Sequence, residues 1–286
     1  MDWSLRMDID YLRTWVGREE YRTEVLSDRI IQQFNATFDL TGEYEDGADA
    51  PPMIHLCLAQ PTVPTRLLGR DGHAELGLFL PPIPLSRRMW AGGSIRFISP
   101  ICVGDKVTRR STIRDITYKK GRTGGLYFVT VDHELTNNGR ILITERQDIV
   151  YRLELPDSND FSKNIKPLEP PPEGKYSRSI KPTSTLLFRY SAMTFNGHRI
   201  HYDFPYSNEI EGYPGLIVHG PLQATLLCHF AIELKGTIPT EFSFRSSVPI
   251  FDNASFNINA NPDGNGLTLW TAAEDGSVAM EASAVW

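Results

Sequence analysis

Cysteine is scarce in this 286-residue chain, which contains only three: Cys57, Cys102 and Cys228. They lie far apart in apolar surroundings, without the close spacing of a metal-binding motif or of a disulfide-stapled small domain. We therefore expect three reduced thiols in a cytoplasmic type of compartment, no disulfide framework and no metal site.

Long apolar runs and a net positive charge are also missing. No hydrophobic stretch approaches the roughly 18 residues that a membrane-spanning helix needs. The N-terminal segment has neither a secretory apolar core nor an arginine-rich transit pattern. The formal net charge of −6 argues against a general nucleic-acid-binding protein. The sequence thus predicts a cytoplasmic protein that binds neither membranes nor nucleic acids.

Basic residues are nevertheless concentrated in one part of the chain. Between Arg66 and Arg122 there are 12 basic and 4 acidic residues, although the chain as a whole is acidic. One interpretation is that these side chains cover solvated strand faces. The other is that some of them bind the phosphates of a ligand, because a planar guanidinium donates two parallel hydrogen bonds to an oxyanion. The arginines considered for this role are Arg87, Arg88, Arg109 and Arg110.

The first half of the chain has the pattern of one helix followed by antiparallel strands. Residues 26–40 have helical apolar spacing, with Ser27 or Asp28 as the N-cap. A segment rich in proline and glycine, 43–93, is too long for a simple connection, so we expect it to wrap the domain and carry function. The period then changes to two, which predicts strands at 94–98, 106–118, 125–136 and 141–152.

A proline-rich stretch, 156–182, separates the two halves and is predicted to be a linker. The second half repeats the order of the first, with a strand at 184–190, a polar loop and an apolar helix at 222–234. Further strands are expected at 241–245, 254–260, 267–274 and 278–285. This repetition indicates an α+β protein with domains at 1–155 and 183–286.

Chemistry-bearing residues are concentrated in the polar loop of the second half. Asn196, His198 and His201 lie within six residues, and His219-Gly220 comes directly before the apolar helix. An imidazole can move a proton near neutral pH, and the free N–H groups of a helix start can stabilise a developing oxyanion. The combination suits carbonyl or acyl-thioester chemistry, although a single histidine is more often a structural hydrogen-bonding residue.

The loop 196–201 and the downstream His219-Gly220 together resemble the D-x-N-x-x-H and H-G signature of MaoC-like, R-specific enoyl-thioester hydratases and dehydratases. Other stretches are similar to the double-hotdog branch that includes mesaconyl-C4-CoA and itaconyl-CoA hydratases. These are D-G-H at 71–73, F-L-P-P-I-P at 79–84, R-R-M-W-A-G-G at 87–93 and I-T-E-R-Q-D-I-V-Y-R at 143–152. The resemblance covers nearly the whole chain. It implies two hotdog domains, each a sheet wrapped around a helix, with the first degenerate and the second catalytic.

Carried over residue by residue, the resemblance assigns the family histidine to His201 and the oxyanion donor to the backbone N–H of Gly220. The family asparagine falls on His198. The family aspartate falls on Asn196, which can orient a water molecule but cannot take a proton. His201 is then the principal acid–base group that adds water to an enoyl-CoA or removes it from a 3-hydroxyacyl thioester. The residues expected to bind the substrate or its CoA are Arg87, Arg88, Trp90 and His219.

Two other functions stay open. A hotdog thioesterase needs a carboxylate or an equivalent group to activate water, and position 196 has none. A non-catalytic acyl-thioester-binding or assembly protein has no need of His201, His219 and Gly220, which this chain retains. No cofactor is expected beyond the CoA of an acyl-CoA substrate, and a homodimer is considered.

The sequence does not identify the acyl group of the substrate either. A methyl-branched dicarboxylic acyl group would need a cation for its second carboxylate, for which Arg189 and Arg199 are candidates. The remaining histidines are interpreted as structural: His55, His73, His133 and His229.

Overall fold

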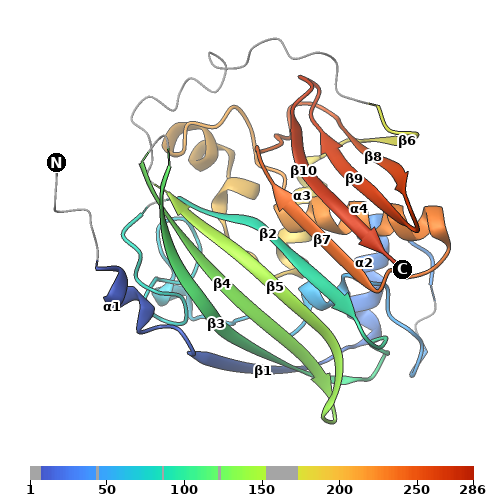
Figure 1. Ribbon diagram of the computed structural model, residues 1–286, viewed down its shortest axis with the longest axis horizontal. Helices are drawn as coiled ribbons and strands as arrows, with labels where there is room; N and C mark the ends of the chain where they lie inside the picture. Colours follow the sequence, from blue (N-terminus) through green and yellow to red (C-terminus); the bar gives the residue numbers. More distant parts are fainter. Residues whose placement is uncertain (1–7, 43–44, 86, 122–123, 153–172) are drawn as a thin grey trace.

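The computed structural model describes residues 8–42, 45–85, 87–121, 124–152 and 173–286. One antiparallel sheet of ten strands forms its centre, in the order β1-β3-β4-β5-β2-β7-β10-β9-β8-β6. Each half of the chain contributes five adjacent strands, and the two halves meet where β2 pairs with β7 (Figure 1). The sheet therefore makes one body of the two predicted domains.

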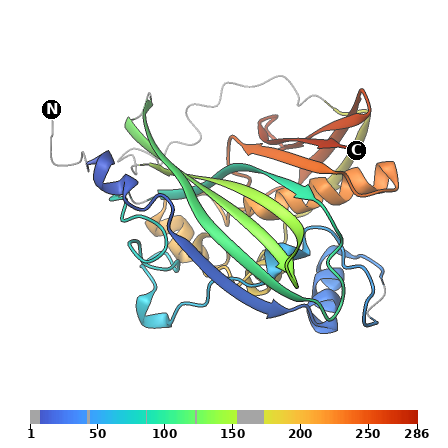
Figure 2. The same cartoon turned by 60° about the horizontal axis from the view of Figure 1, so that its bottom comes forward.

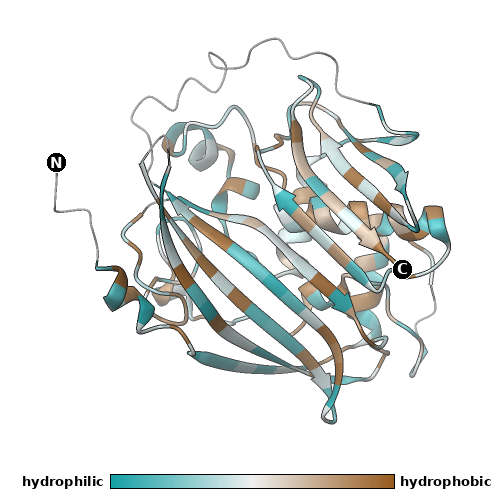
Figure 3. Ribbon diagram, in the orientation of Figure 1, coloured by the Kyte–Doolittle hydropathy of each residue, from teal (hydrophilic) through white to brown (hydrophobic). Residues whose placement is uncertain are grey.

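Strand β4 and most of β3 in the first half alternate between buried and more exposed side chains, as the period of two predicts. In β4 the buried residues are Tyr127, Val129, Val131, His133 and Leu135, and the same alternation appears as bands of colour along the strands in Figure 3. The strands are β1 (Glu19–Val25), β2 (Arg87–Phe97), β3 (Lys106–Gly121), β4 (Gly124–Asn137) and β5 (Arg140–Arg152). Strand β2 begins at Arg87 rather than at Ser94, and β1 was missed by the sequence analysis.

The strands of the second half include one from the predicted linker. Strand β6 (Tyr176–Ile180) pairs with β8 at the outer edge of the sheet, so this part of 156–182 is not a linker. Residues 153–172 lie outside the described part of the chain. The other strands agree with the predictions within a few residues: β7 (Glu241–Ser246), β8 (Phe256–Asp263), β9 (Gly266–Ala272) and β10 (Val278–Val285).

Two of the longer helices were predicted. Helix α2 (Asp28–Phe38) begins after Ser27, whose Oγ accepts a hydrogen bond from the backbone N–H of Ile30. Helix α4 (Gly220–Lys235) is preceded by His219 and ends at Gly236, which adopts the positive φ of 77° that favours glycine. A short helix, α1 (Ile9–Arg13), precedes β1.

Helix α3 (Ser184–Met193) replaces a predicted strand. Its buried residues are Leu187, Tyr190 and Ser191; the last two lie three and four positions after Leu187, which is the helical period. Thr183 caps it by accepting a hydrogen bond from the N–H of Leu186. The prediction was wrong because a short apolar run does not distinguish helix from strand by periodicity alone.

The helices lie on one side of the sheet (Figure 2). Helix α4 packs against β7, β8, β9 and β10, and α2 packs against α3. One continuous core joins them, and it includes Phe34 of α2, Leu187 of α3, Leu227 of α4 and Phe242 of β7. No helix in the described part of the chain is long and apolar enough to cross a membrane. The start of α4 is thus held rigidly beneath the strands where the two halves meet.

Candidate active site

His201 lies in a short 3₁₀ turn, η5 (Arg199–His201), and is buried. Its Nδ1 is 2.7 Å from the carbonyl oxygen of Ile217. A carbonyl oxygen can only accept, so Nδ1 carries the proton and Nε2 keeps the lone pair of a base. Burial lowers the pKa of His201 to about 3, and the bond to Ile217 opposes this shift. The imidazole is therefore neutral, with its basic nitrogen fixed by the fold.

His219 stacks on His201, with ring centroids 3.7 Å apart and planes 19° from parallel. Its Nε2 is 2.8 Å from Oγ of Ser191 on α3. Its Nδ1 is buried and has no hydrogen-bond partner among the described residues. Burial, with a smaller contribution from His201, holds the pKa of His219 well below its ordinary value. A buried ring nitrogen without a partner is suited to meet an oxygen of a bound molecule.

Gly220 is the first residue of α4, and Trp90 of β2 packs directly over it. A Cβ atom at position 220 would lie 3.2 Å from Cε3 of Trp90, tighter than ordinary packing. Trp90 is fixed in turn by Phe244 of β7, with ring centroids 4.4 Å apart. The first N–H groups of a helix have no intrahelical acceptor. The structure therefore brings Gly220, His219 and Trp90 together at a helix start, as the oxyanion hypothesis requires.

Asn196 shapes the loop that carries the histidines. Its Oδ1 accepts a hydrogen bond of 3.0 Å from the backbone N–H of His198, and its own N–H donates to the carbonyl oxygen of Ser191 at 2.8 Å. The side-chain oxygen is therefore committed to the turn. The amide nitrogen of the side chain and the second lone pair of its oxygen can still bind water or substrate.

Replacing Asn196 with aspartate should leave the protein folded and active. A carboxylate can accept the same bond from the N–H of His198, so the turn is kept. The added negative charge favours the protonated imidazoles of His198 and His201, so the acidic limb of the kcat–pH profile should move to higher pH. An inactive Asn196→Asp protein that is folded and binds CoA would show that Asn196 donates a hydrogen bond that aspartate cannot supply.

A loop of the first half docks onto this histidine loop through two glycines. A Cβ atom at Gly72 would lie 2.0 Å from the carbonyl oxygen of Gly197, and one at Gly197 would lie 2.7 Å from that of Gly72. Gly72 also has a φ of +87°, a conformation that side chains disfavour. The backbone N–H of Arg199 donates to the carbonyl oxygen of Asp71 at 2.9 Å. These contacts make the first half part of the site.

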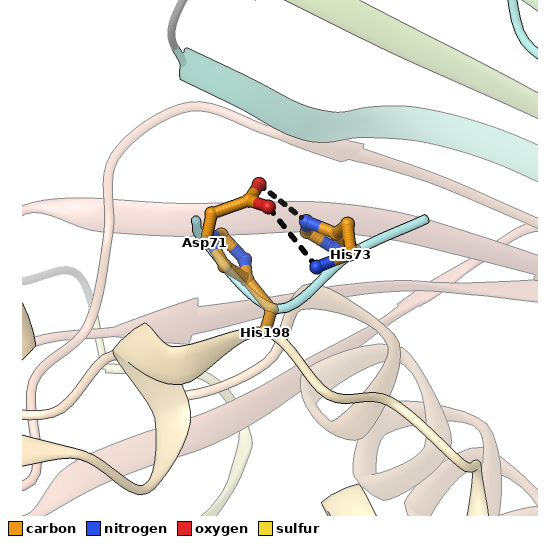
Figure 4. Close-up of side chains that lie close together, drawn as sticks. All are labelled: Asp71, His73 and His198. Atoms are coloured by element: carbon orange, nitrogen blue, oxygen red, sulfur yellow. Dashed lines mark hydrogen bonds and ion pairs between the residues drawn. The ribbon is translucent and has the colours of Figure 1, made fainter. Parts of the chain in front are cut away.

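The docked loop brings Asp71 and His73 to His198 (Figure 4). Nδ1 of His73 is 2.8 Å from Oδ2 of Asp71, and the backbone N–H of His73 donates to Oδ1 at 3.0 Å. The rings of His73 and His198 are 4.1 Å apart between centroids, and those of His198 and His201 are 5.3 Å apart. His73 was predicted to be structural, although the D-x-H spacing is suited to a carboxylate–imidazole pair.

Donor atoms of Asp71, His73 and His198 all lie within 4.8 Å of one another, so the three side chains could hold a cation. Burial alone would raise the pKa of Asp71, but the hydrogen bonds from His73 and the charge of Arg88 lower it to about 2. Burial, followed by the charge of Arg88, lowers the pKa of His73 to about 4, although Asp71 acts in the opposite direction. In the empty site the pair is thus a carboxylate and a neutral imidazole.

A cavity of about 290 Å³ opens beside this pair. Asp71 and His73 line it together with Arg88, Tyr151 and Tyr206. Arg88 takes part in none of the salt bridges among the described residues, and its charge acts on Asp71 and His73. The cavity therefore combines acid–base groups with a cation that forms no salt bridge in the described part of the chain.

The other arginines that were considered for ligand phosphates have different surroundings. Arg87 is buried, donates to the carbonyl oxygen of Glu211 at 2.7 Å and lies over the ring of Tyr213. Arg109 is buried against His133, with its Nη2 3.1 Å from Nε2 of the imidazole. Arg110 forms a surface salt bridge of 3.2 Å with Glu134. Of the four, Arg88 is the one that lines the cavity.

The two arginines proposed for a distal carboxylate also have protein partners. Arg199 forms a salt bridge of 2.8 Å with Asp203 and lies over the ring of Tyr206. Arg189 donates to the carbonyl oxygen of Ala36 at 3.2 Å. Arg88 is therefore better placed for that role than either.

Comparison with known proteins agrees with this geometry. Residues 53–252 match the hydroxyacyl-thioester dehydratase type 2 family. The chain is 42% identical over 275 residues to the mesaconyl-C(4)-CoA hydratase of Chloroflexus aurantiacus, covering 94% of this chain and 95% of that protein. A MaoC-like dehydratase structure has a TM-score of 0.69 at 15% identity, covering 96% of this chain and 99% of the other.

A Mycobacterium tuberculosis structure described as a double hotdog fold has a TM-score of 0.56 at 12% identity, covering 94% of this chain and 96% of that one. The predicted α+β double hotdog fold is thus confirmed. The chain belongs to the hydroxyacyl-thioester dehydratase type 2 family, and it is a hydro-lyase that adds water to, or removes it from, the α,β double bond of an acyl thioester.

Proposed function

We propose that the enzyme hydrates an enoyl-CoA whose acyl group carries a second carboxylate, with mesaconyl-C4-CoA as the first substrate to test. The observation that carries this proposal is Arg88, which lines the cavity beside Asp71 and His73 without a salt-bridge partner among the described residues. In mesaconyl-C4-CoA the free carboxylate is bonded to Cβ, the carbon that receives water. Its counter-cation must therefore lie beside the acid–base groups, as Arg88 does.

The proposed reaction uses the basic nitrogen of His201 and the start of α4. Nε2 of His201 takes a proton from water while the water oxygen bonds to Cβ. The electron pair of the double bond moves toward the thioester, and the enolate oxygen is stabilised by the backbone N–H of Gly220. A proton then adds to Cα, and the site run in reverse dehydrates a 3-hydroxyacyl thioester. His198 borders His201, and Trp90 and His219 hold the thioester end.

The proposal changes the roles of two arginines. A long pantetheine arm separates the phosphates of CoA from the thioester, so a residue next to the acid–base groups is placed for the acyl group instead. We assign Arg88 to the acyl carboxylate, where a charge-assisted hydrogen bond contributes roughly 1.5–3 kcal/mol. Arg87, held by Glu211 and Tyr213, supports the wall of the site and contacts CoA only if Glu211 moves.

Replacing Arg88 with methionine should raise KM for mesaconyl-C4-CoA about tenfold or more, with a much smaller effect on crotonyl-CoA, which has no second carboxylate. Methionine keeps an apolar stem of similar length but removes the charge. The expected measurement is kcat and KM for both thioesters. The change should be mainly in KM, because the carboxylate is bound equally in the ground and transition states.

Arg96→Met is the matched control, since Arg96 lies on the same strand, β2, with an exposed side chain. It should change neither substrate's KM by more than about twofold. Equal losses on both substrates in Arg88→Met would show that Arg88 acts through folding or through CoA. The assignment to the acyl carboxylate would then have to be abandoned.

The hydration assay also separates the other functions. A thioesterase releases free CoA thiol from the same substrates, and a non-catalytic binding protein changes neither the double bond nor the thioester. Three expectations accompany the proposal. The first is catalysis without a cofactor or metal other than the CoA of the substrate. The second is a cytoplasmic location, which the three free cysteines support. The third is a homodimer, which light scattering tests.

A further inference from the structure

Addition of water to a double bond needs two proton transfers, one from the water and one to Cα. His201 can serve one of them, with its free Nε2. In the family signature a carboxylate shares the proton handling, but here Asn196 occupies that position and its side-chain oxygen is bonded to the loop. A second proton-transfer group, if it is not His201 itself, comes from another part of the structure.

We propose that His73, held by Asp71, is this second acid–base group: it delivers the proton to Cα during hydration and removes it during dehydration. The proposal rests on the proposed hydratase function and adds a residue from the half of the chain that was expected to be degenerate. In these terms His73 is a catalytic residue and Asp71 a positioning residue.

The geometry favours a catalytic role for His73 over a structural one. The side chain is 23% exposed and lines the cavity, whereas His219 is fully buried. Asp71 binds Nδ1, so Nε2 is the nitrogen that can meet a substrate. A carboxylate on Nδ1 fixes the orientation of the ring and stabilises the imidazolium when it forms.

The docking of the loop is a second, independent observation. The peptide at Gly72 contacts the peptide at Gly197 so closely that a side chain at either position would collide with the opposite backbone. The backbone N–H of Arg199 donates to the carbonyl oxygen of Asp71, and the Arg199 guanidinium donates to the carbonyl oxygen of Arg70. The fold thus fixes His73 directly against the loop that carries His198 and His201.

The proton and electron balance closes with these residues. Water gives a proton to Nε2 of His201, its oxygen bonds to Cβ, and the electron pair of the double bond forms the enolate. The enolate collapses, Cα takes the proton from Nε2 of protonated His73, and His73 becomes neutral. The proton on His201 then returns to His73, and the ring of His198 contacts both of the other rings. The protein is unchanged after each turnover.

The bound substrate helps to place the proton on His73. The groups around this imidazole are Asp71, which favours the protonated form, and Arg88 and burial, which oppose it. A substrate carboxylate at Arg88 offsets that positive charge. The other ionisable side chains of the cavity are Arg70, Glu75, Tyr151, Tyr206 and Glu211.

The test is exchange of the Cα hydrogen in D₂O, with the hydration product of the substrate that the wild-type enzyme turns over. His201→Gln should still exchange this hydrogen, because His73 alone removes it, but should not dehydrate the product. His73→Gln should lose exchange and turnover together, each by about 10²–10⁴-fold, with KM within about threefold of wild type. Asp71→Asn should show a smaller loss in kcat of about tenfold or more.

His229→Gln is the matched control, because His229 bonds the carbonyl oxygen of Pro52 away from the site, and a glutamine amide can donate the same bond. It should retain both activities. The proposal is overturned if folded His73→Gln keeps turnover and exchange within about threefold of wild type, or if it changes KM alone.

A metal role is the remaining alternative for these three side chains. Stoichiometric metal in the purified wild-type protein, lost in His73→Gln and needed for activity after chelation, would replace the proton-transfer role with a cation site. If the wild-type protein hydrates no enoyl-CoA, the proposed function itself fails. If it does so and His73→Gln is equally active, this inference alone fails.

Discussion

The His201→Ala enzyme is expected to turn over at least about 10²-fold more slowly than the wild type, with KM little changed. His201 is a buried imidazole, and its bond to the carbonyl oxygen of Ile217 fixes the tautomer. Its Nε2 is therefore a neutral base that can take a proton. Alanine removes that base, and position 196 is asparagine, so the carboxylate of the family signature is not there to replace it. The measurement is kcat and KM on the substrate identified by the hydration assay.

The His201→Gln variant distinguishes the loss of the base from the loss of side-chain packing. Glutamine fills more of the space beside His219 and can still donate a hydrogen bond to Ile217, but it cannot take a proton. Both variants should lose activity similarly, and thermal unfolding should show that both are folded. Activity within about threefold of wild type in either folded variant would remove His201 from the proton-transfer step.

The protein is expected to lose its folded structure on mild acidification. All seven histidines have native pKa values below the ordinary 6.5 because of burial; the value is about 3 for His55 and His201 and about 4 for His73 and His229. Below pH 6.5 the unfolded chain therefore binds more protons than the folded one, so the free energy of unfolding falls as the pH falls toward these native pKa values.

The expected decrease in the free energy of unfolding is large. Each histidine costs up to about 1.4 kcal/mol per pH unit below its unfolded pKa, so seven together approach roughly 10 kcal/mol over one unit, and a typical domain has about 5–15 kcal/mol in total. We expect unfolding by about pH 5. Denaturant titrations between pH 7.5 and 5 measure the slope.

His229→Gln provides the matched control for this effect. It should reduce the slope by about one proton, or about 1.4 kcal/mol per pH unit, because His229 is one of the seven. A free energy of unfolding that stays constant between pH 7 and 5 would show that the histidines are solvated or protonated in the native state. It would also weaken the argument that His201 and His73 are neutral in the empty site.

Much of the fold follows from local patterns. The period of two in β3, β4 and β5 and the apolar run of α4 are signals that a short window of sequence contains. The residues Asn196, His198, His201 and His219-Gly220 likewise predicted the family, because His201 and His219-Gly220 keep the residue types and order of its signature, although Asn196 and His198 depart from it.

Some elements depend on neighbours that are distant in the sequence. Helix α3 was predicted as a strand because a short apolar segment fits both periods, and packing against α2 decides which forms. Strand β6 was hidden in a proline-rich stretch because an edge strand is fixed mainly by its partner, here β8.

The composition of the site was also decided by tertiary structure. The sequence alone predicted that His201 and Gly220 act in one catalytic unit, since they are placed by one loop and one helix start. It could not determine that Asp71 and His73 join them, because that depends on two glycine peptides meeting across 125 residues, Gly72 and Gly197. Nor could it choose Arg88 over Arg87, since adjacent residues of a strand point to opposite faces and only the packed structure shows which face borders the cavity.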